Sequence, residues 1–238
     1  STANNEAGNQ YFNTIIAMCE GKMGNIRELY FGDDLVWSGN QSSDNGTTLS
    51  SYAGGTYQSA LNDNSTIKYY NGSTSQTRDS NVGNSVGSDW PSNARLQGIA
   101  YLSLRLKANA EAYAGGLPLF TAVLEGKAIQ NVNNLTEGQT SYLASPTVGA
   151  DQNAVDCIYD YLTNPIYGKG LDHDSSGNYI AGKDIDLVSF KAARSHAAAR
   201  GHVFNGTLST RQRIYENIQR LTSSCNGLLV YSAGKYKL

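Results

Sequence analysis

The organisation of this chain is decided by the stretch Asp160-Tyr161-Leu162-Thr163-Asn164-Pro165-Ile166-Tyr167-Gly168-Lys169-Gly170. Because the residue before a proline avoids the α-helical region, Asn164-Pro165 predicts the end of a helix. Gly168 and Gly170 permit backbone conformations that other residues resist. We therefore expect a helix that ends in a sharp turn and passes the chain to a second helix.

Two helices are predicted on either side of this turn. The first begins at Asn153, an N-cap candidate with Asp156 three residues later, as in a capping box. The second begins at Asp186 and ends at Gly201. Each has apolar residues at helical spacing on one face. These are Ala154, Cys157, Ile158, Tyr161 and Leu162 in the first helix, and Leu187, Phe190, Ala193 and Ala197 in the second.

A third helix and a hairpin are predicted after these two. Residues 202–208 predict a short strand with a turn, and Ser209 with Gln212 predicts a capping box. The helix that follows has a stripe at helical spacing and ends at Asn226-Gly227. The stripe consists of Ile214, Ile218, Leu221 and Cys225. Residues 228–238 predict a hairpin whose second strand has barely begun, so we expect further chain beyond Leu238.

The first half of the chain is typical of antiparallel strands joined by polar loops. Strands are predicted over 11–19, 26–31, 35–37, 67–70, 98–107 and 119–125. Within the fifth of these, alternation of Leu102, Leu104 and Leu106 with polar residues predicts a half-buried strand. A polar insertion at 38–66 is expected to be either a mobile loop or a small excursion with its own contacts.

Together these patterns predict an α+β fold with two domains. Residues 11–130 are expected to form a barrel-like or sandwich-like antiparallel β domain that includes the insertion at 38–66. Residues 131–149 are rich in Asn, Thr and Gly and are expected to link the domains. Residues 150–238 are expected to form a small domain of three helices and a hairpin.

The composition favours proteins or sugars as partners. The 238 residues have a formal net charge of −2, so we expect neither nucleic acid nor an anionic membrane as a partner. Charged residues are 16% of the chain, against roughly 25% in an ordinary soluble domain. The 16 Tyr provide contact area at low entropic cost, although a β-rich extracellular or virion protein has a similar composition. No apolar run approaches the ~20 residues of a membrane span, and Ser1–Asn5 begins no signal peptide.

The three cysteines, Cys19, Cys157 and Cys225, do not form a disulfide framework, because they are few and odd in number. Cys157 and Cys225 fall on apolar helix faces, where a buried free thiol is the usual state. A reducing compartment is therefore expected during folding.

A set of residues in a fixed order runs through the chain, and it begins with Cys19-Glu20-Gly21 ahead of the hairpin at 29–36. After these come Ala100-Tyr101-Leu102, Gly116-Leu117-Pro118 and Glu125-Gly126-Lys127, then Asn153, Asp160–Asn164, Tyr167–Gly170, Ile185-Asp186, Ser189-Phe190, Cys225–Gly227, Val230-Tyr231 and Gly234–Tyr236. This order resembles the tail tip attachment protein family of lambda-like phages (protein J, the central tail hub). The resemblance covers about residues 11–238 and is best after residue 150. Lys22 stands where the family usually has Pro, and the loop Leu171–Lys183 is longer than expected.

The resemblance implies a structural virion protein without enzyme activity. Hub proteins of this family form a homotrimer that closes the distal end of the tail tube and docks tip proteins or fibres, in host attachment and genome delivery. Barrel-like domains in each copy match the hexameric tube ring, and helical domains hold the channel closed until infection. The expected location is the phage tail tip or baseplate of the virion, after synthesis in the cytoplasm of the host bacterium.

Four groups of residues are candidates for chemical sites. Residues 171–178 resemble the start of a calcium loop, but the twelfth position is Lys183 instead of a bidentate carboxylate. His173, His196 and His202 have no zinc-ligand spacing with any Cys. Glu20 with Asp33-Asp34 is a weak candidate for a hydrolase pair. Arg211, Arg213 and Arg220 predict a basic side of the last helix, either solvated or pairing with another subunit. We predict no catalytic, cofactor-binding or metal-binding residue.

Two alternative functions remain open beside the structural one. Aromatic and amide-rich loops at 38–95 are compatible with a carbohydrate-binding adhesin, and this hypothesis requires that Tyr69, Tyr70 and Trp90 be exposed together. A tail-borne glycan hydrolase is the third hypothesis, and it lacks an acid pair on a defined cleft. The sequence leaves open which phage is involved, which residues form interfaces, and whether Ser1 and Leu238 are true termini.

Overall fold

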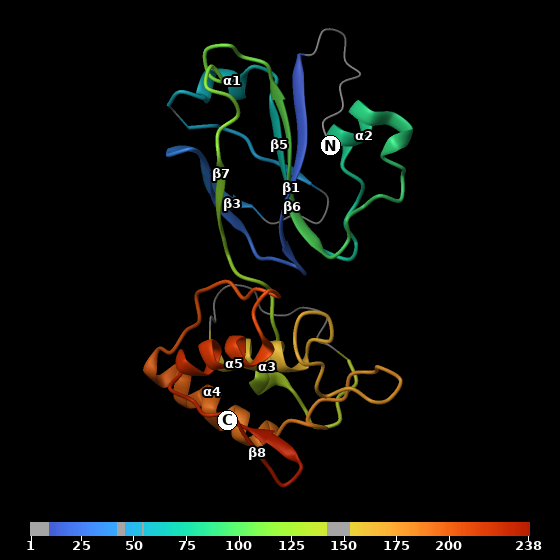
Figure 1. Ribbon diagram of the computed structural model, residues 1–238, viewed down its shortest axis with the longest axis vertical. Helices are drawn as coiled ribbons and strands as arrows, with labels where there is room; N and C mark the ends of the chain where they lie inside the picture. Colours follow the sequence, from blue (N-terminus) through green and yellow to red (C-terminus); the bar gives the residue numbers. More distant parts are fainter. Residues whose placement is uncertain (1–9, 42–45, 54, 142–152) are drawn as a thin grey trace. The chain divides into compact units, whose positions relative to one another are not determined.

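The computed structural model describes residues 10–41, 46–53, 55–141 and 153–238 (Figure 1). The chain divides into two compact units, Ser1–Lys127 and Ala128–Leu238, which we call the β-rich unit and the helical unit. The strands of both units pair antiparallel within their sheets, and five α-helices are assigned among the described residues. The mixed α and β character predicted from the sequence is therefore confirmed.

The β-rich unit contains two antiparallel sheets. The larger has the order β1-β6-β5-β4, with β1 Tyr11–Glu20, β4 Thr47–Thr48, β5 Thr66–Asn71 and β6 Ile99–Lys107. The smaller has the order β3-β2-β7, with β2 Ile26–Phe31, β3 Asp34–Gln41 and β7 Phe120–Leu124. Every strand predicted for this half is present, but the described strands do not close into a barrel.

Both sheets contribute to one hydrophobic core. Leu29, Phe31 and Trp37 from the smaller sheet belong to the same buried cluster as Tyr69 and Leu102 from the larger sheet. The rings of Phe31 and Phe120 meet edge to face, with their centroids 4.7 Å apart. Burial of these large side chains is the main source of stability for this unit.

The insertion at 38–66 is a small excursion with its own contacts. Its beginning extends β3 to Gln41, and its end contains the short helix α1, Gln58–Asn62. Leu49, Tyr52 and Leu61 from the insertion are buried in the shared core. Residues 42–45 and 54 lie outside the described residues.

The prediction that β6 is half-buried is wrong, because both of its faces are covered. Tyr101 and Ser103 are as completely buried as the leucines that alternate with them. Their face is covered by α2, Ser80–Val86, which continues into the single turn η1, Gly87–Asp89. The Asn81 side chain on α2 donates a hydrogen bond to Ser103 Oγ over 3.4 Å. The sequence does not predict α2, because a helix of Ser, Asn, Gly and Val has no apolar periodicity.

The helical unit is organised around α3, Ala154–Thr163 (Figure 1). The other helices are α4, Leu187–Arg200, and α5, Ile214–Ser223, and both pack against α3. The turn η2, Val132–Asn134, also contacts α3. The prediction of one buried face is therefore wrong for α3: every residue except Cys157 is buried, on all sides. For α4, the expected face is confirmed by buried Leu187, Phe190 and Ala197.

The hairpin closes the helical unit beside the start of α4. It consists of β8, Val230–Ser232, and β9, Lys235–Lys237. On its other side, β9 forms a parallel bridge between Tyr236 and Ile185. The N–H of Asp186 donates to the Tyr236 carbonyl over 2.9 Å, and the N–H of Tyr236 donates to the Asp184 carbonyl over 2.8 Å. β9 is therefore an inner strand of this small arrangement, and β8 is the outer one.

Some helix ends lie where the sequence predicts them, and others do not. The Asn153 and Asp186 side chains accept N-cap hydrogen bonds as predicted, and Gly201 ends α4 in the left-handed region. The predicted box of Ser209 and Gln212 is wrong, because α5 begins at Ile214 and Arg213 N–H donates instead to Glu216. The predicted strand at 202–208 is also wrong: within the described part of the chain, this segment pairs through one isolated bridge, from Val203 to Asn153.

The start of the expected linker belongs to the helical unit. Val132 and Leu135 are fully buried in the core cluster that contains α3. The contact boundary between the units accordingly lies between Lys127 and Ala128. Residues 142–149, the remainder of the expected linker, and residues 150–152, the start of the expected helical domain, lie outside the described residues. Among the described helices, none has the combination of length and apolar character needed to cross a membrane.

The turn after α3 has the tight geometry that its sequence predicts. The Asn164 side chain accepts a hydrogen bond from the N–H of Ile166, over 2.9 Å. The N–H of Lys169 donates a hydrogen bond to the Tyr161 carbonyl over 3.0 Å. Gly168 lies directly against this carbonyl, and a Cβ atom at Gly168 would clash with it and lie 2.8 Å from the Asn164 carbonyl. Only glycine fits this position without movement of the backbone.

We expect Gly168→Ala to lower the free energy of unfolding of the helical unit by about 1–3 kcal/mol, because the backbone must shift to admit the methyl group. Gly206→Ala is the matched control, since its Cβ would touch only the ring of Phe204, at 3.1 Å. Hydrogen exchange of peptides from α3, followed by mass spectrometry, measures the effect on this unit alone. Equal stability of the two variants would contradict the steric explanation.

Candidate functional sites

A buried carboxylate joins the loop after α3 to the start of α4. Asp172 is fully buried, and it adopts a left-handed conformation with φ 60°. Its carboxylate accepts hydrogen bonds from the N–H groups of Gly182, Asp184 and Ile185, at 2.9, 2.7 and 3.1 Å. It also accepts one from the Tyr159 hydroxyl on α3, at 2.8 Å. This carboxylate therefore fixes the long loop onto the central helix.

The phenols beside Asp172 remain protonated donors. Burial raises the pKa of Tyr159 far above its usual value, and the negative charge of Asp172 is the second cause of this rise. Burial likewise raises the pKa of Tyr179 to about 12, and the two hydroxyl oxygens are 2.8 Å apart. The protonated Tyr159 hydroxyl donates to the buried carboxylate, and it can in turn accept a hydrogen bond from Tyr179.

The segment that resembles a calcium loop is satisfied by its own chain. The Asp174 carboxylate accepts hydrogen bonds from the N–H groups of Ser176 and Asn178, each over 2.8 Å, and from the Asn178 side-chain amide. The Asn178 side chain is the first cause of the lowered pKa of Asp174. Asp172, the first position of the motif, directs its oxygens to backbone N–H groups. Among the described residues, no group of three or more His, Cys, Asp or Glu is arranged to hold a metal ion.

A buried ion pair connects α3 with α4. The Nε of Arg194 lies 2.9 and 3.1 Å from the two carboxylate oxygens of Asp156. The two side chains are only 7% and 2% exposed. Asp156 also accepts a hydrogen bond from the N–H of Val132, over 2.8 Å. Asp156 on α3 therefore connects this helix to α4, through Arg194, and to η2, through Val132. The predicted role of Asp156 in a capping box with Asn153 is wrong.

The three cysteines are free thiols, as expected. Burial raises the pKa of Cys19 to about 11 and that of Cys157 to about 12. It also raises the pKa of Cys225, whose thiol donates a hydrogen bond to the Thr222 carbonyl. Since the thiolate is the reactive form, a raised pKa lowers the reactivity of a thiol at neutral pH.

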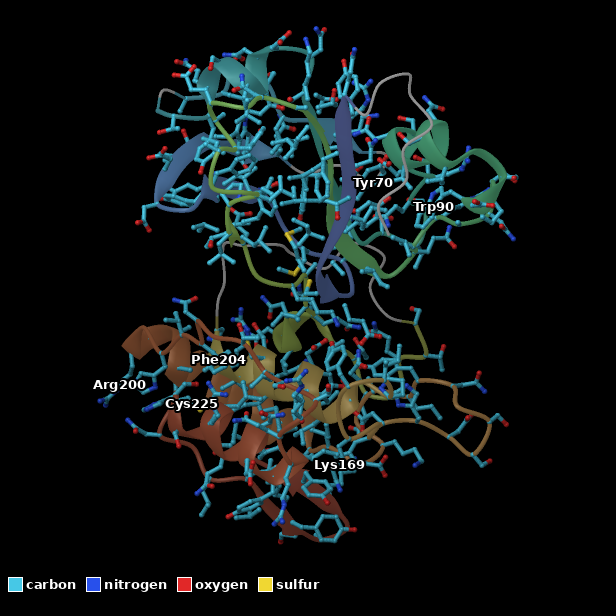
Figure 2. All side chains as sticks on the ribbon, turned by 45° about the horizontal axis from the view of Figure 1, so that its top comes forward. Tyr70, Trp90, Lys169, Arg200, Phe204 and Cys225 are labelled. Carbon is cyan, nitrogen blue, oxygen red and sulfur yellow. The ribbon has the colours of Figure 1, made fainter. Side chains whose placement is uncertain are left out.

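Two of the three histidines meet at one pocket, which was not predicted from their spacing. The rings of His196 on α4 and His202 after it lie edge to face, with their centroids 6.4 Å apart. The pocket has a volume of about 240 Å³, and Arg200 and Cys225 also line it. In Figure 2, Arg200 extends outward from the helical unit and Cys225 lies closer to its centre. His173 belongs elsewhere, with its Nδ1 2.8 Å from the Leu171 carbonyl.

The aromatic platform expected of an adhesin is not formed. Tyr69 and Tyr70 are almost completely buried, and the Tyr70 ring stacks on that of Tyr101 with centroids 4.4 Å apart. Trp90 is partly buried, and its carbonyl accepts a hydrogen bond from Arg78 (Figure 2). The carbohydrate-binding hypothesis thus loses the exposed aromatic set on which it rests.

The two other residue groups are not assembled as the sequence suggested. Glu20 ends β1 in the larger sheet, whereas Asp33 lies in the turn between β2 and β3 and Asp34 begins β3 in the smaller sheet. The two ends of the six-residue strand β2 are ~20 Å apart, and Asp33 follows one end whereas the chain from Glu20 enters at the other. Arg211 and Arg213 precede α5, so they do not share a helix face with Arg220. Arg220 binds the Gln212 side chain over 3.1 Å and so holds the preceding loop.

The hairpin presents an apolar edge. Leu228, Val230 and Tyr231 are exposed, and Tyr231 is 66% exposed. We call these three residues the hairpin edge. Among the described residues β8 pairs only with β9, so the other side of β8 offers unpaired backbone groups. An exposed strand edge with aromatic and aliphatic side chains is a typical docking site for another chain.

The smaller sheet of the β-rich unit has an apolar outer face. Val123 on β7 and Leu35 on β3 are exposed, and Leu119 just before β7 is 76% exposed. Tyr30 pairs with Leu35 in the sheet, and its hydroxyl donates to Glu28 over 2.6 Å. This face mixes apolar area with satisfied polar groups, as protein interfaces do.

The likeness of this chain to known proteins is weak. No family model matches the sequence, and no curated protein matches it. A solved structure described as the virion of a native gene transfer agent particle resembles the chain, with 15% sequence identity and a TM-score of 0.39. The match covers 73% of this chain and 38% of that chain, so this chain spans well under half the length of its match. A likeness at this level assigns neither a family nor a function to the chain.

Proposed function

We propose that this protein is a structural component of a phage-like virion, a protomer of the trimeric hub at the tip of the tail. It closes the tail tube and docks neighbouring tip proteins or fibres, and it acts through packing and symmetry without catalysis. The hairpin edge is the observation that carries this proposal, since it leaves unpaired backbone and exposed Tyr231 available to another chain.

Two further features support an assembly role. The order of residues that resembles the tail tip attachment family includes Val230-Tyr231 and Gly234–Tyr236, which form this hairpin. In addition, the ionisable groups in the core of the helical unit are engaged with one another or with backbone: Asp172 binds three N–H groups, and Asp156 binds Arg194. These interactions hold the segments of the helical unit in fixed positions. A rigid protomer is suited to a symmetric assembly.

We expect native mass spectrometry to give a particle of three times the 25.6 kDa protomer mass. Tyr231→Ala is expected to raise the dissociation constant of this trimer by ~30-fold or more, because tyrosines at interface centres commonly contribute ~2 kcal/mol. Dilution series followed by mass photometry or native mass spectrometry measure the constant.

Tyr215→Ala is the matched control, since Tyr215 is 71% exposed on α5 and lies at no strand edge. It is expected to leave the trimer unchanged. A wild-type protein that stays monomeric at all concentrations would refute the hub proposal. A trimer that is sensitive to Tyr215→Ala and insensitive to Tyr231→Ala would refute the role of the hairpin edge.

A further inference from the structure

Asn-Gly pairs occur at several places in this chain. Those that lie wholly within the described residues are Asn71-Gly72, Asn205-Gly206 and Asn226-Gly227, whereas Asn45 of the pair with Gly46 lies outside them. Asparagine is a chemically labile residue, and a following glycine leaves the next backbone nitrogen unhindered. Because the residue that follows is the same in every pair, the fold decides which pair reacts.

The reaction at such a pair depends on the backbone nitrogen of the glycine. This nitrogen gives up its proton and attacks Cγ of the asparagine side chain. An N–H group that donates a hydrogen bond is held in place, and its acceptor also disfavours loss of the proton. A pair with an engaged glycine N–H is therefore protected in the folded protein.

Two of the described pairs are protected in this way. The N–H of Gly72 donates to Gln76 Oε1 over 3.0 Å, and Asn71 itself is fully buried. The N–H of Gly227 donates to the Thr222 carbonyl over 2.9 Å, in the turn that follows α5. We expect both pairs to react slowly while the protein is folded.

The pair Asn205-Gly206 has neither burial nor an engaged nitrogen. Asn205, Gly206 and Thr207 are exposed to solvent in the segment between α4 and α5. Within the described part of the chain, the N–H of Gly206 makes no hydrogen bond. Phe204 before the pair (Figure 2) and Leu208 after it pack against the core cluster of the helical unit. The pair is thus presented at the surface between two packed side chains.

We propose that Asn205 is a site of spontaneous deamidation through a cyclic imide. The Gly206 nitrogen forms a bond to Asn205 Cγ, the bond from Cγ to Nδ2 breaks, and ammonia leaves with the proton that the Gly206 nitrogen gives up. Water then opens the ring. Opening at the side-chain carbonyl gives aspartate, and opening at the main-chain carbonyl gives isoaspartate. Water is the co-reactant, and no group is oxidised or reduced.

Isoaspartate at this position alters the contact of the segment with α3. The main chain of isoaspartate runs through Cβ and is longer by one carbon atom. The segment is held at both ends: the His202 carbonyl accepts from Ala154 N–H over 3.3 Å, and the Thr207 carbonyl accepts from Arg220 over 3.4 Å. We expect faster hydrogen exchange at the start of α3 in the aged protein than in Asn205→Asp, which adds the charge without lengthening the chain.

The test incubates the full chain in mildly alkaline buffer, both folded and in urea, and follows tryptic peptides by mass spectrometry. Residues 69–78, 201–211 and 221–235 each contain a single Asn-Gly pair. In urea these pairs are expected to react at similar rates. In the folded chain we expect Asn71 and Asn226 to react ~10-fold more slowly or less, because a hydrogen bond must open first, and Asn205 to keep its rate within about twofold.

Gly206→Ala is expected to slow the reaction at Asn205 by ~10-fold, because the added Cβ restricts the attacking nitrogen. Enzymatic methylation of the peptide 201–211 identifies the isoaspartate product. Protection of Asn205 by folding to the same degree as the other two pairs would overturn the assignment, as would an unchanged rate in Gly206→Ala. Equal hydrogen exchange at the start of α3 in the aged protein and in Asn205→Asp would overturn the effect on α3.

Discussion

Asp172→Asn is expected to lower the free energy of unfolding of the helical unit by about 4 kcal/mol, the largest effect we predict for an isosteric change. One carboxylate oxygen accepts from Gly182 N–H and the Tyr159 hydroxyl, and the other from the N–H groups of Asp184 and Ile185. The amide replaces one acceptor with a donor and removes the charge that strengthens all four bonds. Because Asn tolerates the left-handed region, backbone strain does not contribute.

Asp174→Asn in the same loop is the matched control. Its carboxylate also accepts backbone hydrogen bonds, but the residue is only partly buried, so solvent can replace them. We expect a loss below ~1 kcal/mol. Hydrogen exchange of α3 peptides again measures the helical unit alone, which matters because both tryptophans belong to the β-rich unit. Similar losses for the two variants would show that the buried carboxylate has no special role.

Arg194→Met is expected to cost about 3–5 kcal/mol, because it leaves the Asp156 carboxylate buried without a counter-charge. Methionine preserves much of the aliphatic volume, so the loss reports the ion pair more than the packing. Lys235→Met is the matched control, since the pair of Lys235 with Glu137 is 2.7 Å long but exposed. Exposed pairs contribute roughly 0–1 kcal/mol.

The double variant Asp156→Asn with Arg194→Met tests the cause of this loss. If the uncompensated charge is responsible, the double variant is expected to be more stable than Arg194→Met alone by ~1 kcal/mol or more. If the double variant is less stable than either single variant, lost packing or the hydrogen bond to Val132 dominates instead.

The elements that sequence analysis located well are those with local signals. The strands of the β-rich unit follow runs of β-forming residues bounded by polar turns, and the ends of α3 and α4 follow Asn153, Asp186 and Gly201. The turn at Asn164-Pro165 is equally local, because proline and glycine restrict their own neighbourhood. In each of these cases the deciding interactions lie within a few residues.

The features that were missed depend on contacts between distant residues. The sequence of α3 predicts one buried face, yet α4, α5 and η2 pack around this helix. Its polar residues Asp156 and Asp160 are also buried, and both have side-chain partners. The pocket joins His196 with Cys225, which no spacing rule connects. Asp172 stands at the first position of a segment that resembles a calcium loop, and the sequence does not show that its oxygens point to backbone N–H groups. The second covered face of β6 could not be predicted, because α2, which covers Tyr101 and Ser103, has no apolar periodicity in the sequence.

The pairing of β9 with residues 184–186 has a mechanical consequence. A force along β9 would load the two backbone hydrogen bonds at Tyr236 in shear, so both must break together before the strand slides. β8, held by β9 alone, would peel away one bond at a time. The end of the chain described here is thus anchored against tension, and a segment attached to it would transmit a pull directly into the beginning of α4.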